Sequence, residues 1–120
     1  MKLATIRDGN RTLAVRREGD EVVELAAADV GEVLRREGWQ SWAAEVDGAR
    51  RPVADLDFAP VVPNPDKIVC AGLNYRSHIL EMGRELPEHP TLFAKYRGAL
   101  IGANDEITLP AVSDQVDWEA

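Results

Sequence analysis

The first 25 residues consist of short runs typical of β-strands, separated by turn residues. The runs cover residues 2–7, 11–17 and 21–25, and apolar and polar positions alternate along the second of them. An Asp-Gly pair lies at 8–9 and a Glu-Gly-Asp triplet at 18–20. Asp-Gly between two strand-like runs is a strong hairpin signal. The pattern predicts a three-stranded antiparallel meander.

Helical signals follow the predicted meander. Asp29 can cap a helix over residues 30–37, whose apolar residues share one face, and Gly38 marks its expected end. A second short helix is expected to carry Trp39 and Trp42. Together with the strands, these helices predict a small meander-plus-helix domain.

The composition changes over residues 51–65, which show no helical period. The stretch contains Pro52, Pro60, Pro63 and Pro65. Because proline fixes φ and removes a backbone donor, we expect a stiff connector here rather than a helix or strand. The sequence therefore predicts two domains, 1–58 and 59–120.

The second part of the chain alternates between apolar runs and turn residues. Strands are predicted at 67–71, 91–95, 107–109 and 116–120, and a short helix at 75–82. The whole chain is thus expected to be an α+β protein that is rich in β-structure. Its last residues carry no polar tail, glycine or proline, so we expect the chain to be cut within a strand rather than finished.

Composition narrows the classes of partner. The chain has 120 residues, of which 14 are basic and 21 acidic, giving a net charge of −7. Nucleic acid and anionic membranes bind clustered Lys and Arg, so neither is an expected partner. Cys70 is the single cysteine and cannot form an internal disulfide. With no signal peptide or membrane-spanning run in the sequence, we expect a cytoplasmic protein.

One pair of side chains could perform acid-base chemistry. His78 and Glu81 stand at positions i and i+3 of the predicted helix, so the carboxylate could orient the imidazole or share a proton with it. The alternative is an ordinary exposed pair, and such pairs are common by chance. The spacing by itself favours that alternative.

Four further residues carry groups that could take part in chemistry. Asp117 and Glu119 would share one face of a strand and could bind a hard cation such as Mg²⁺, or could simply be solvated. Lys95 ends an apolar strand, where its ammonium could reach a substrate oxygen, although a snorkelling edge lysine is commoner. Cys70 lies within an apolar strand and is expected to be a structural thiol.

Residues 65–82, PDKIVCAGLNYRSHILEM, closely resemble the start of the catalytic domain in the fumarylacetoacetate hydrolase family. PTLFAK at 90–95, GALIG at 98–102 and LPAVSDQVDWEA at 109–120 follow in the order and spacing of that family. These segments cover about half of the chain. The first 58 residues resemble, more weakly, the accessory N-terminal domain of many bacterial members.

The resemblance implies a β-rich catalytic fold that holds Mg²⁺ or Mn²⁺ with three carboxylates, the first two in a Glu-x-Glu motif. Glu119 matches the first ligand, and the other two would fall beyond the last residue of the chain. His78 and Glu81 match the catalytic dyad, and Lys95 matches a lysine that faces the substrate. Asp117 is not a ligand in this correspondence, which withdraws the paired-carboxylate interpretation for that residue.

The resemblance also implies a substrate class. Family members act on small 2-oxo or 1,3-dicarbonyl acids, which the metal can chelate and polarise. We expect a hydrolase of carbon-carbon bonds in acylpyruvates from aromatic-compound catabolism, acting as a homodimer when full length. Alternatives on the same scaffold are an isomerase of the 2-hydroxyhepta-2,4-diene-1,7-dioate type and an oxaloacetate-type decarboxylase. An alternative of another class is a non-catalytic fragment or assembly module. Leu73 stands where some members carry arginine.

Overall fold

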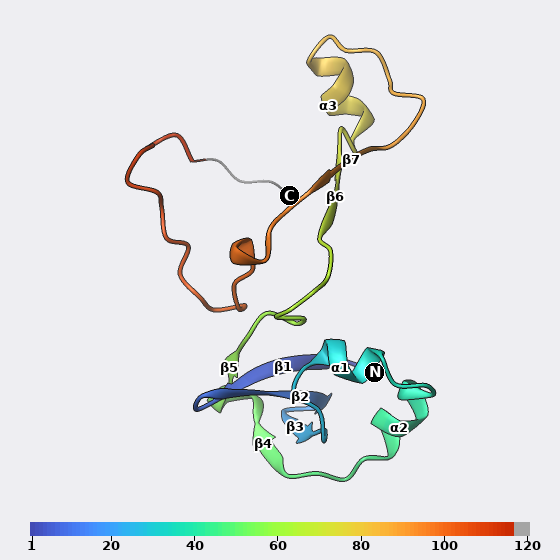
Figure 1. Cartoon of the computed structure of the whole chain (residues 1–120), viewed down its shortest axis with the longest axis vertical. Helices are drawn as coiled ribbons and strands as arrows, with labels where there is room; N and C mark the ends of the chain where they lie inside the picture. Colours follow the sequence, from blue (N-terminus) through green and yellow to red (C-terminus); the bar gives the residue numbers. More distant parts are fainter. Residues whose placement is uncertain (117–120) are drawn as a thin grey trace. The chain divides into compact units, whose positions relative to one another are not determined.

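The computed structural model describes residues 1–116, which form two compact units (Figure 1). The first unit consists of residues 1–62 together with the segment that begins at Ile101, and the second consists of residues 63–100. The fold is α+β and rich in β-structure, as the sequence predicted. No helix in the described part of the chain is long and apolar enough to cross a membrane.

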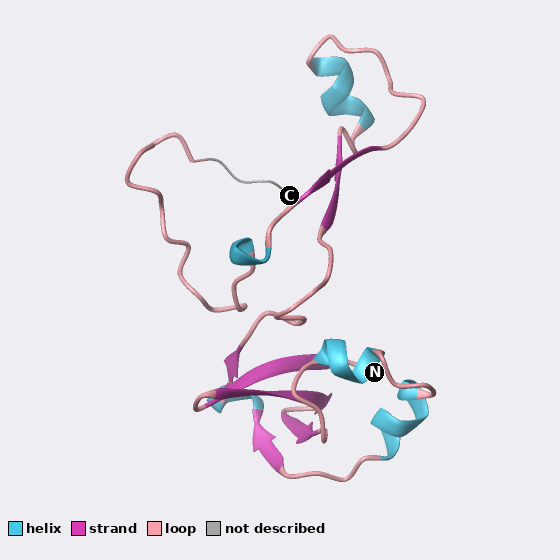
Figure 2. Cartoon of the chain, in the orientation of Figure 1, coloured by secondary structure: helices cyan, strands magenta, loops and turns pink. Residues whose placement is uncertain are grey.

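The first unit is built on a five-stranded antiparallel sheet in the order β4-β3-β2-β1-β5 (Figure 2). The strands are β1 Leu3–Asp8, β2 Arg11–Glu18, β3 Glu21–Glu24, β4 Arg50–Pro52 and β5 Asp57–Phe58. Strands β1 to β3 are the predicted meander. Its register pairs Thr5 with Ala14 and Val15 with Glu24. The turn residues between the runs were therefore sufficient to predict the first three strands.

Two short helices, α1 Val30–Leu34 and α2 Trp39–Glu45, complete the first unit. The predicted cap is confirmed, because the Asp29 carboxylate accepts a hydrogen bond from the Glu32 N–H at 2.8 Å. Helix α1 ends earlier than residue 37, its predicted end. Since Val33 and Ala43 enter the same core cluster, the chain turns between them instead of continuing one helix.

The core of the first unit lies in two clusters of buried apolar side chains. One gathers Ala14, Leu25, Ala27, Val33 and Ala43, and the other Ile6, Val15 and Val22. The clusters remove these side chains from water, which is the main favourable contribution to folding.

Arg16 is a charged residue that the first unit buries, with 8% of its surface exposed. Its guanidinium donates to Glu18 at 2.5 Å, to the Val46 carbonyl at 3.1 Å and to the Ala43 carbonyl. The last carbonyls of a helix lack partners within the helix, so this arginine satisfies two of them at the end of α2. Arg16 thereby joins β2 to α2.

The prediction of a structureless connector over 51–65 is wrong in its first half. Strand β4, the 3-10 helix η1 Val53–Asp55 and strand β5 all lie in or next to it. Both strands are at edges of the sheet. An edge strand tolerates proline because one side of it needs no backbone donor, and Pro52 is the last residue of β4.

The second unit is a hairpin that carries one helix. Its elements are β6 Val69–Gly72, α3 Arg76–Glu81, β7 Thr91–Ala94 and the 3-10 helix η2 Arg97–Ala99. The strands pair antiparallel, Val69 with Ala94 and Gly72 with Thr91. These elements confirm the predicted strands at 67–71 and 91–95 and the helix at 75–82.

The predicted strand at 107–109 is wrong. Residues 107–109 have no regular structure, and Ile107 and Leu109 are 74% and 61% exposed. Alternation over three residues does not make a strand unless a neighbouring edge satisfies its backbone groups. Of the strand predicted at 116–120, all but Val116 lies outside the described residues, and Val116 is not in a strand.

The close approach of Gly48 to Glu24 predicts a sensitive position in the first unit. A Cβ at Gly48 would lie 2.0 Å from the Glu24 carbonyl oxygen, so Gly48→Ala has to push two backbone segments apart. We expect it to lower the free energy of unfolding by about 1–3 kcal/mol in urea denaturation.

Gly98→Ala is the matched control, because a Cβ there meets nothing within 4 Å. It should change stability by less than about 0.5 kcal/mol. Equal stability of Gly48→Ala and the unmodified chain would show that the close approach is absent in solution.

Candidate functional site

Helix α3 carries the two residues of the predicted dyad, and its boundaries are well defined. Ile79 is 3% exposed and anchors the helix. At its end, the N–H groups of Gly83 and Arg84 donate to the carbonyls of Leu80 and Ile79 at 3.0 and 3.1 Å, and Gly83 has a φ of 67°. This is a Schellman motif, which needs a left-handed residue and therefore favours glycine. The motif fixes where α3 ends.

His78 and Glu81 are both on α3 and both exposed. Residues three apart on a helix lie on the same face, with Cβ atoms roughly 5–6 Å apart. The structure thus places both residues of the predicted pair on α3 and open to solvent. Nothing buried has to move before a small molecule could reach either group.

Lys95 is at the other end of the hairpin from α3. Strand β6 leads into α3, and its antiparallel partner β7 runs away from that helix (Figure 1). Ala94, the last residue of β7, pairs with Val69, the first residue of β6, so Lys95 follows the end of the hairpin that is remote from α3. The Lys95 N–H donates to the Ile68 carbonyl at 3.1 Å, and its ammonium is 5.7 Å from the centre of the Phe93 ring. At ~3.3 Å per residue, Lys95 is about 13 Å along the strand from Thr91.

A hollow of about 400 Å³ surrounds Lys95. It is lined by Pro65, Asp66, Lys67, Ile68, Val69, Ala94, Lys95, Tyr96 and Arg97. Three cationic side chains and one carboxylate are among these residues. The excess of positive charge favours binding of a small anion. Sequence reasoning missed Lys67 and Arg97. The signal was the hairpin pairing, which places residues just before β6 beside residues just after β7.

A metal site is not present among residues 1–116. In that range, no three His, Cys, Asp or Glu side chains are grouped so that they could hold an ion. The predicted ligand Glu119, and Asp117 beside it, lie outside the described residues. The described side chains therefore do not fit a bound Mg²⁺ or Mn²⁺ by themselves.

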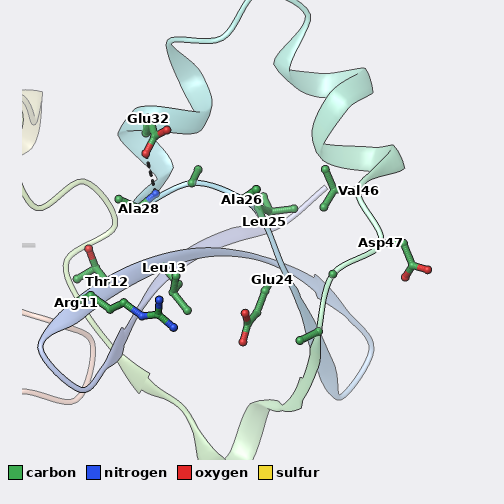
Figure 3. Close-up of a pocket in the computed structure, with 13 residues that line it drawn as sticks. Arg11, Thr12, Leu13, Glu24, Leu25, Ala26, Ala28, Glu32, Val46 and Asp47 are labelled. Atoms are coloured by element: carbon green, nitrogen blue, oxygen red, sulfur yellow. Dashed lines mark hydrogen bonds between the residues drawn. The ribbon is translucent and has the colours of Figure 1, made fainter.

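A larger hollow of about 680 Å³ lies on the first unit (Figure 3). Three of the charged groups that line it are paired: Glu24 accepts from Arg51 at 2.6 Å, Arg11 donates to Asp8 at 2.8 Å, and Glu32 accepts from the Ala28 N–H at 2.7 Å. The guanidiniums of Arg11 and then Arg51 hold the pKa of Asp8 below its ordinary value. These contacts stabilise the sheet and leave little unpaired charge for a ligand.

Leu73 is a strained residue beside α3. Among the described residues it is the single non-glycine with a positive φ, at 52°. A bulky residue in this region costs of order 1–3 kcal/mol, and such residues cluster at functional sites. The turn between β6 and α3 is therefore held in an unfavourable conformation just before the dyad.

We predict that Leu73→Gly is more stable locally than Leu73→Ala. Both variants lose the leucine side chain, but alanine keeps the Cβ that opposes a positive φ. Because α3 begins three residues later, the turn and the helix should open together. The Ile79 N–H, which donates to Tyr75 at 3.1 Å, should exchange about fivefold more slowly with glycine, corresponding to ~1 kcal/mol.

Amide hydrogen exchange followed by NMR measures this difference. At an ordinary negative φ the order reverses, because glycine is then the less stable of the two. Equal or faster exchange of Ile79 in the glycine variant would contradict the strained turn.

Comparison with known proteins shows what the segment that carries α3 is similar to. Residues 67–120 match the family model described as fumarylacetoacetate hydrolase C-terminal. A mitochondrial oxaloacetate tautomerase of Bos taurus is 41% identical over 68 residues, which are 57% of this chain and 22% of the relative. A mitochondrial oxaloacetate tautomerase of Xenopus laevis is 44% identical over 67 residues, 56% of this chain and 21% of the relative.

A solved structure extends the likeness to the first unit. A Mycobacterium smegmatis protein superposes with a TM-score of 0.72 at 28% identity, covering 92% of this chain and 41% of that protein. The chain thus spans about a fifth of the length of the curated relatives, at 22% and 21%, and less than half of this solved one. The likeness includes both units.

Proposed function

Because residues 67–120 belong to the fumarylacetoacetate hydrolase family, we propose that the protein carrying this chain is an enzyme that moves a proton next to the carbonyl of a small 2-oxo dicarboxylic acid. The observation that carries the proposal is the exposed pair His78 and Glu81 on α3, within the matched segment. The names of the curated relatives support keto-enol tautomerisation of an acid such as oxaloacetate. This favours the isomerase alternative over the hydrolase expected from the sequence.

Keto-enol conversion needs a base that removes a proton from the carbon next to the carbonyl, and a proton for the oxygen. Histidine is the commonest side chain in this role, since it can both accept and donate a proton. We assign the transfer to His78 and propose that Glu81 orients its ring. An orienting carboxylate holds the imidazole in one tautomer and stabilises the cation formed when it takes the proton.

Lys95 is assigned a different role, because it lies at the opposite end of the hairpin from α3. A dicarboxylate carries two negative charges, and Lys67, Lys95 and Arg97 line the hollow there. We propose that Lys95 and its cationic neighbours attract the acid, while the dyad performs the proton transfer. Charges that line a hollow raise the local concentration of an anion and its rate of association.

Carbon-carbon hydrolysis is a second candidate, supported by the description of the family model. It uses the same groups, with His78 taking a proton from a water molecule that attacks the acyl carbonyl. The carbon-carbon bond to the pyruvate part then breaks, and pyruvate leaves as its enolate, which takes up a proton. We further propose Glu119 as one carboxylate ligand of Mg²⁺ or Mn²⁺, with the remaining ligands outside the described residues. A bound divalent ion would polarise the substrate carbonyl.

The test uses the complete gene product with Mg²⁺, offered enol-oxaloacetate and, separately, acylpyruvates. His78→Ala should lower turnover by about 100-fold or more, as expected for loss of a general base, with Mg²⁺ affinity unchanged. Glu81→Gln should lower it less, because it removes an orienting partner. Glu119→Gln should weaken Mg²⁺ binding, measured by calorimetry, as well as activity.

His89→Ala is the matched control, since His89 is the other histidine of the chain and is exposed in a loop. It should retain full activity. If His78→Ala is as active as His89→Ala, the dyad has no role. Conversion without loss of carbon identifies the tautomerase, and release of pyruvate from an acylpyruvate identifies the hydrolase. No turnover of either substrate by the metal-bound protein would favour the non-catalytic module.

A further inference from the structure

Strand β1 contacts the chain on both sides of the 63–100 segment. On the leading side, the Ala59 N–H donates to the Thr5 carbonyl at 3.0 Å. The Thr5 hydroxyl donates to the Val61 carbonyl at 2.6 Å and accepts from the Val30 N–H at 3.1 Å. Thr5 is 1% exposed, so these hydrogen bonds are protected from water. The chain is therefore fastened immediately before it leaves the first unit.

After residue 100 the chain returns to the first unit, and there Arg7 of the same strand binds the carboxylate of Asp105. Its two terminal nitrogens donate to the two carboxylate oxygens of Asp105 at 3.0 and 2.6 Å. One of them also donates to Asp57 at 2.7 Å and to the Phe58 carbonyl at 3.2 Å. Bidentate arginine-carboxylate contacts are among the stronger and more directional hydrogen bonds in proteins. Thr5 and Arg7 are two residues apart, so their side chains leave β1 on the same face.

The turn from Gly102 to Asp105 is shaped for this contact. The Gly102 N–H donates to the Asp105 carboxylate at 2.6 Å, and the Asp105 N–H donates back to the Gly102 carbonyl at 3.2 Å. A Cβ at Gly102 would lie 1.9 Å from the Phe58 carbonyl oxygen. Only glycine allows the returning chain to pass this close to β5.

We propose that Arg7, Gly102 and Asp105 form a clasp that closes the 63–100 segment into a loop whose two ends are held on β1 and β5. Such closure restricts the conformations of a segment without adding contacts within it. The segment is the one that carries His78, Glu81 and Lys95, so the clasp limits how far those residues can move. It is a device of the fold that does not depend on the proposed reaction.

The clasp can open without unfolding the sheet. The side chains of Arg7 and Asp105 are 35% and 30% exposed, so water and salt reach the ion pair. Asp57 faces the same guanidinium and competes for it. The hydrogen bonds from Arg7 and, after it, from the Gly102 N–H keep the pKa of Asp105 below its ordinary value. The ion pair therefore stays charged until the pH falls below the ordinary pKa of an aspartate. Opening at neutral pH is therefore governed by salt or substitution.

Amide exchange of Gly102 in the full chain tests the clasp. Arg7→Ala leaves the Gly102 N–H and its acceptor intact, so faster exchange there with unchanged exchange in the sheet shows that Arg7 holds the turn in place. We expect at least a tenfold increase in Arg7→Ala. The N–H groups of Ala14 and Leu25, whose hydrogen bonds of 2.9 and 2.8 Å join β2 to the segment that follows β3, should change their exchange rates by less than twofold.

Arg11→Ala is the matched control, because Arg11 forms an ion pair with Asp8 at 2.8 Å on the same sheet, and no hydrogen bond or ion pair joins it to residues 101–116 of the returning chain. It should leave the exchange rate of the Gly102 N–H unchanged. The Arg7→Ala/Asp105→Ala double variant should exchange at Gly102 no faster than Asp105→Ala, since paired residues are not additive. Unchanged exchange in Arg7→Ala would overturn the clasp. Equal acceleration of Ala14 and Leu25 would also overturn it, because Arg7 would then support the whole sheet.

Discussion

The hydroxyl group of Thr5 joins three parts of the first unit at one buried point. It accepts from the first residue of α1, donates to the chain at Val61, and belongs to β1, which lies between β2 and the edge strand β5. A buried hydroxyl costs free energy unless its hydrogen bonds are made, and here both donor and acceptor functions are used. The packing of α1 and the exit of the chain from the sheet both depend on this arrangement.

The two units differ in how much apolar surface they bury. The first unit buries two clusters of apolar side chains, together with the hydrogen-bonded guanidinium of Arg16. The hairpin of the second unit leaves Val69, Leu92 and Phe93 at 61%, 63% and 38% exposed. A two-stranded hairpin is marginally stable in water. The residues proposed for chemistry thus lie on the less stable part, where mobile functional segments are generally found.

Elements set by local signals could be predicted from the sequence. Asp8-Gly9 gave the first hairpin, Asp29 the cap of α1, and Gly83 the end of α3. Strands β4 and β5 were missed because they form by pairing with distant strands, and prolines at a sheet edge look like a connector. Non-local pairing leaves no local signal.

The candidate site, too, could be predicted only where it depends on residues that are close in sequence. His78 and Glu81 could be placed together because helical spacing is local. The cationic hollow depends on the register between β6 and β7, which the sequence does not give locally. The positive φ of Leu73 could not be predicted either, because leucine does not favour that conformation. The fastening by Arg7 joins residues 98 positions apart, which no motif in the sequence indicated.

The stability of the chain resides in the first unit, which holds both ends of the 63–100 segment. Amide exchange of the 120-residue chain tests this directly. The Ala14 and Leu25 N–H groups should exchange slowest, at the rate of global unfolding, and those of Ile79 and Lys95 at least about 100-fold faster through local opening. Equal protection at all four positions would contradict the account, because the hairpin and α3 would then unfold only with the sheet.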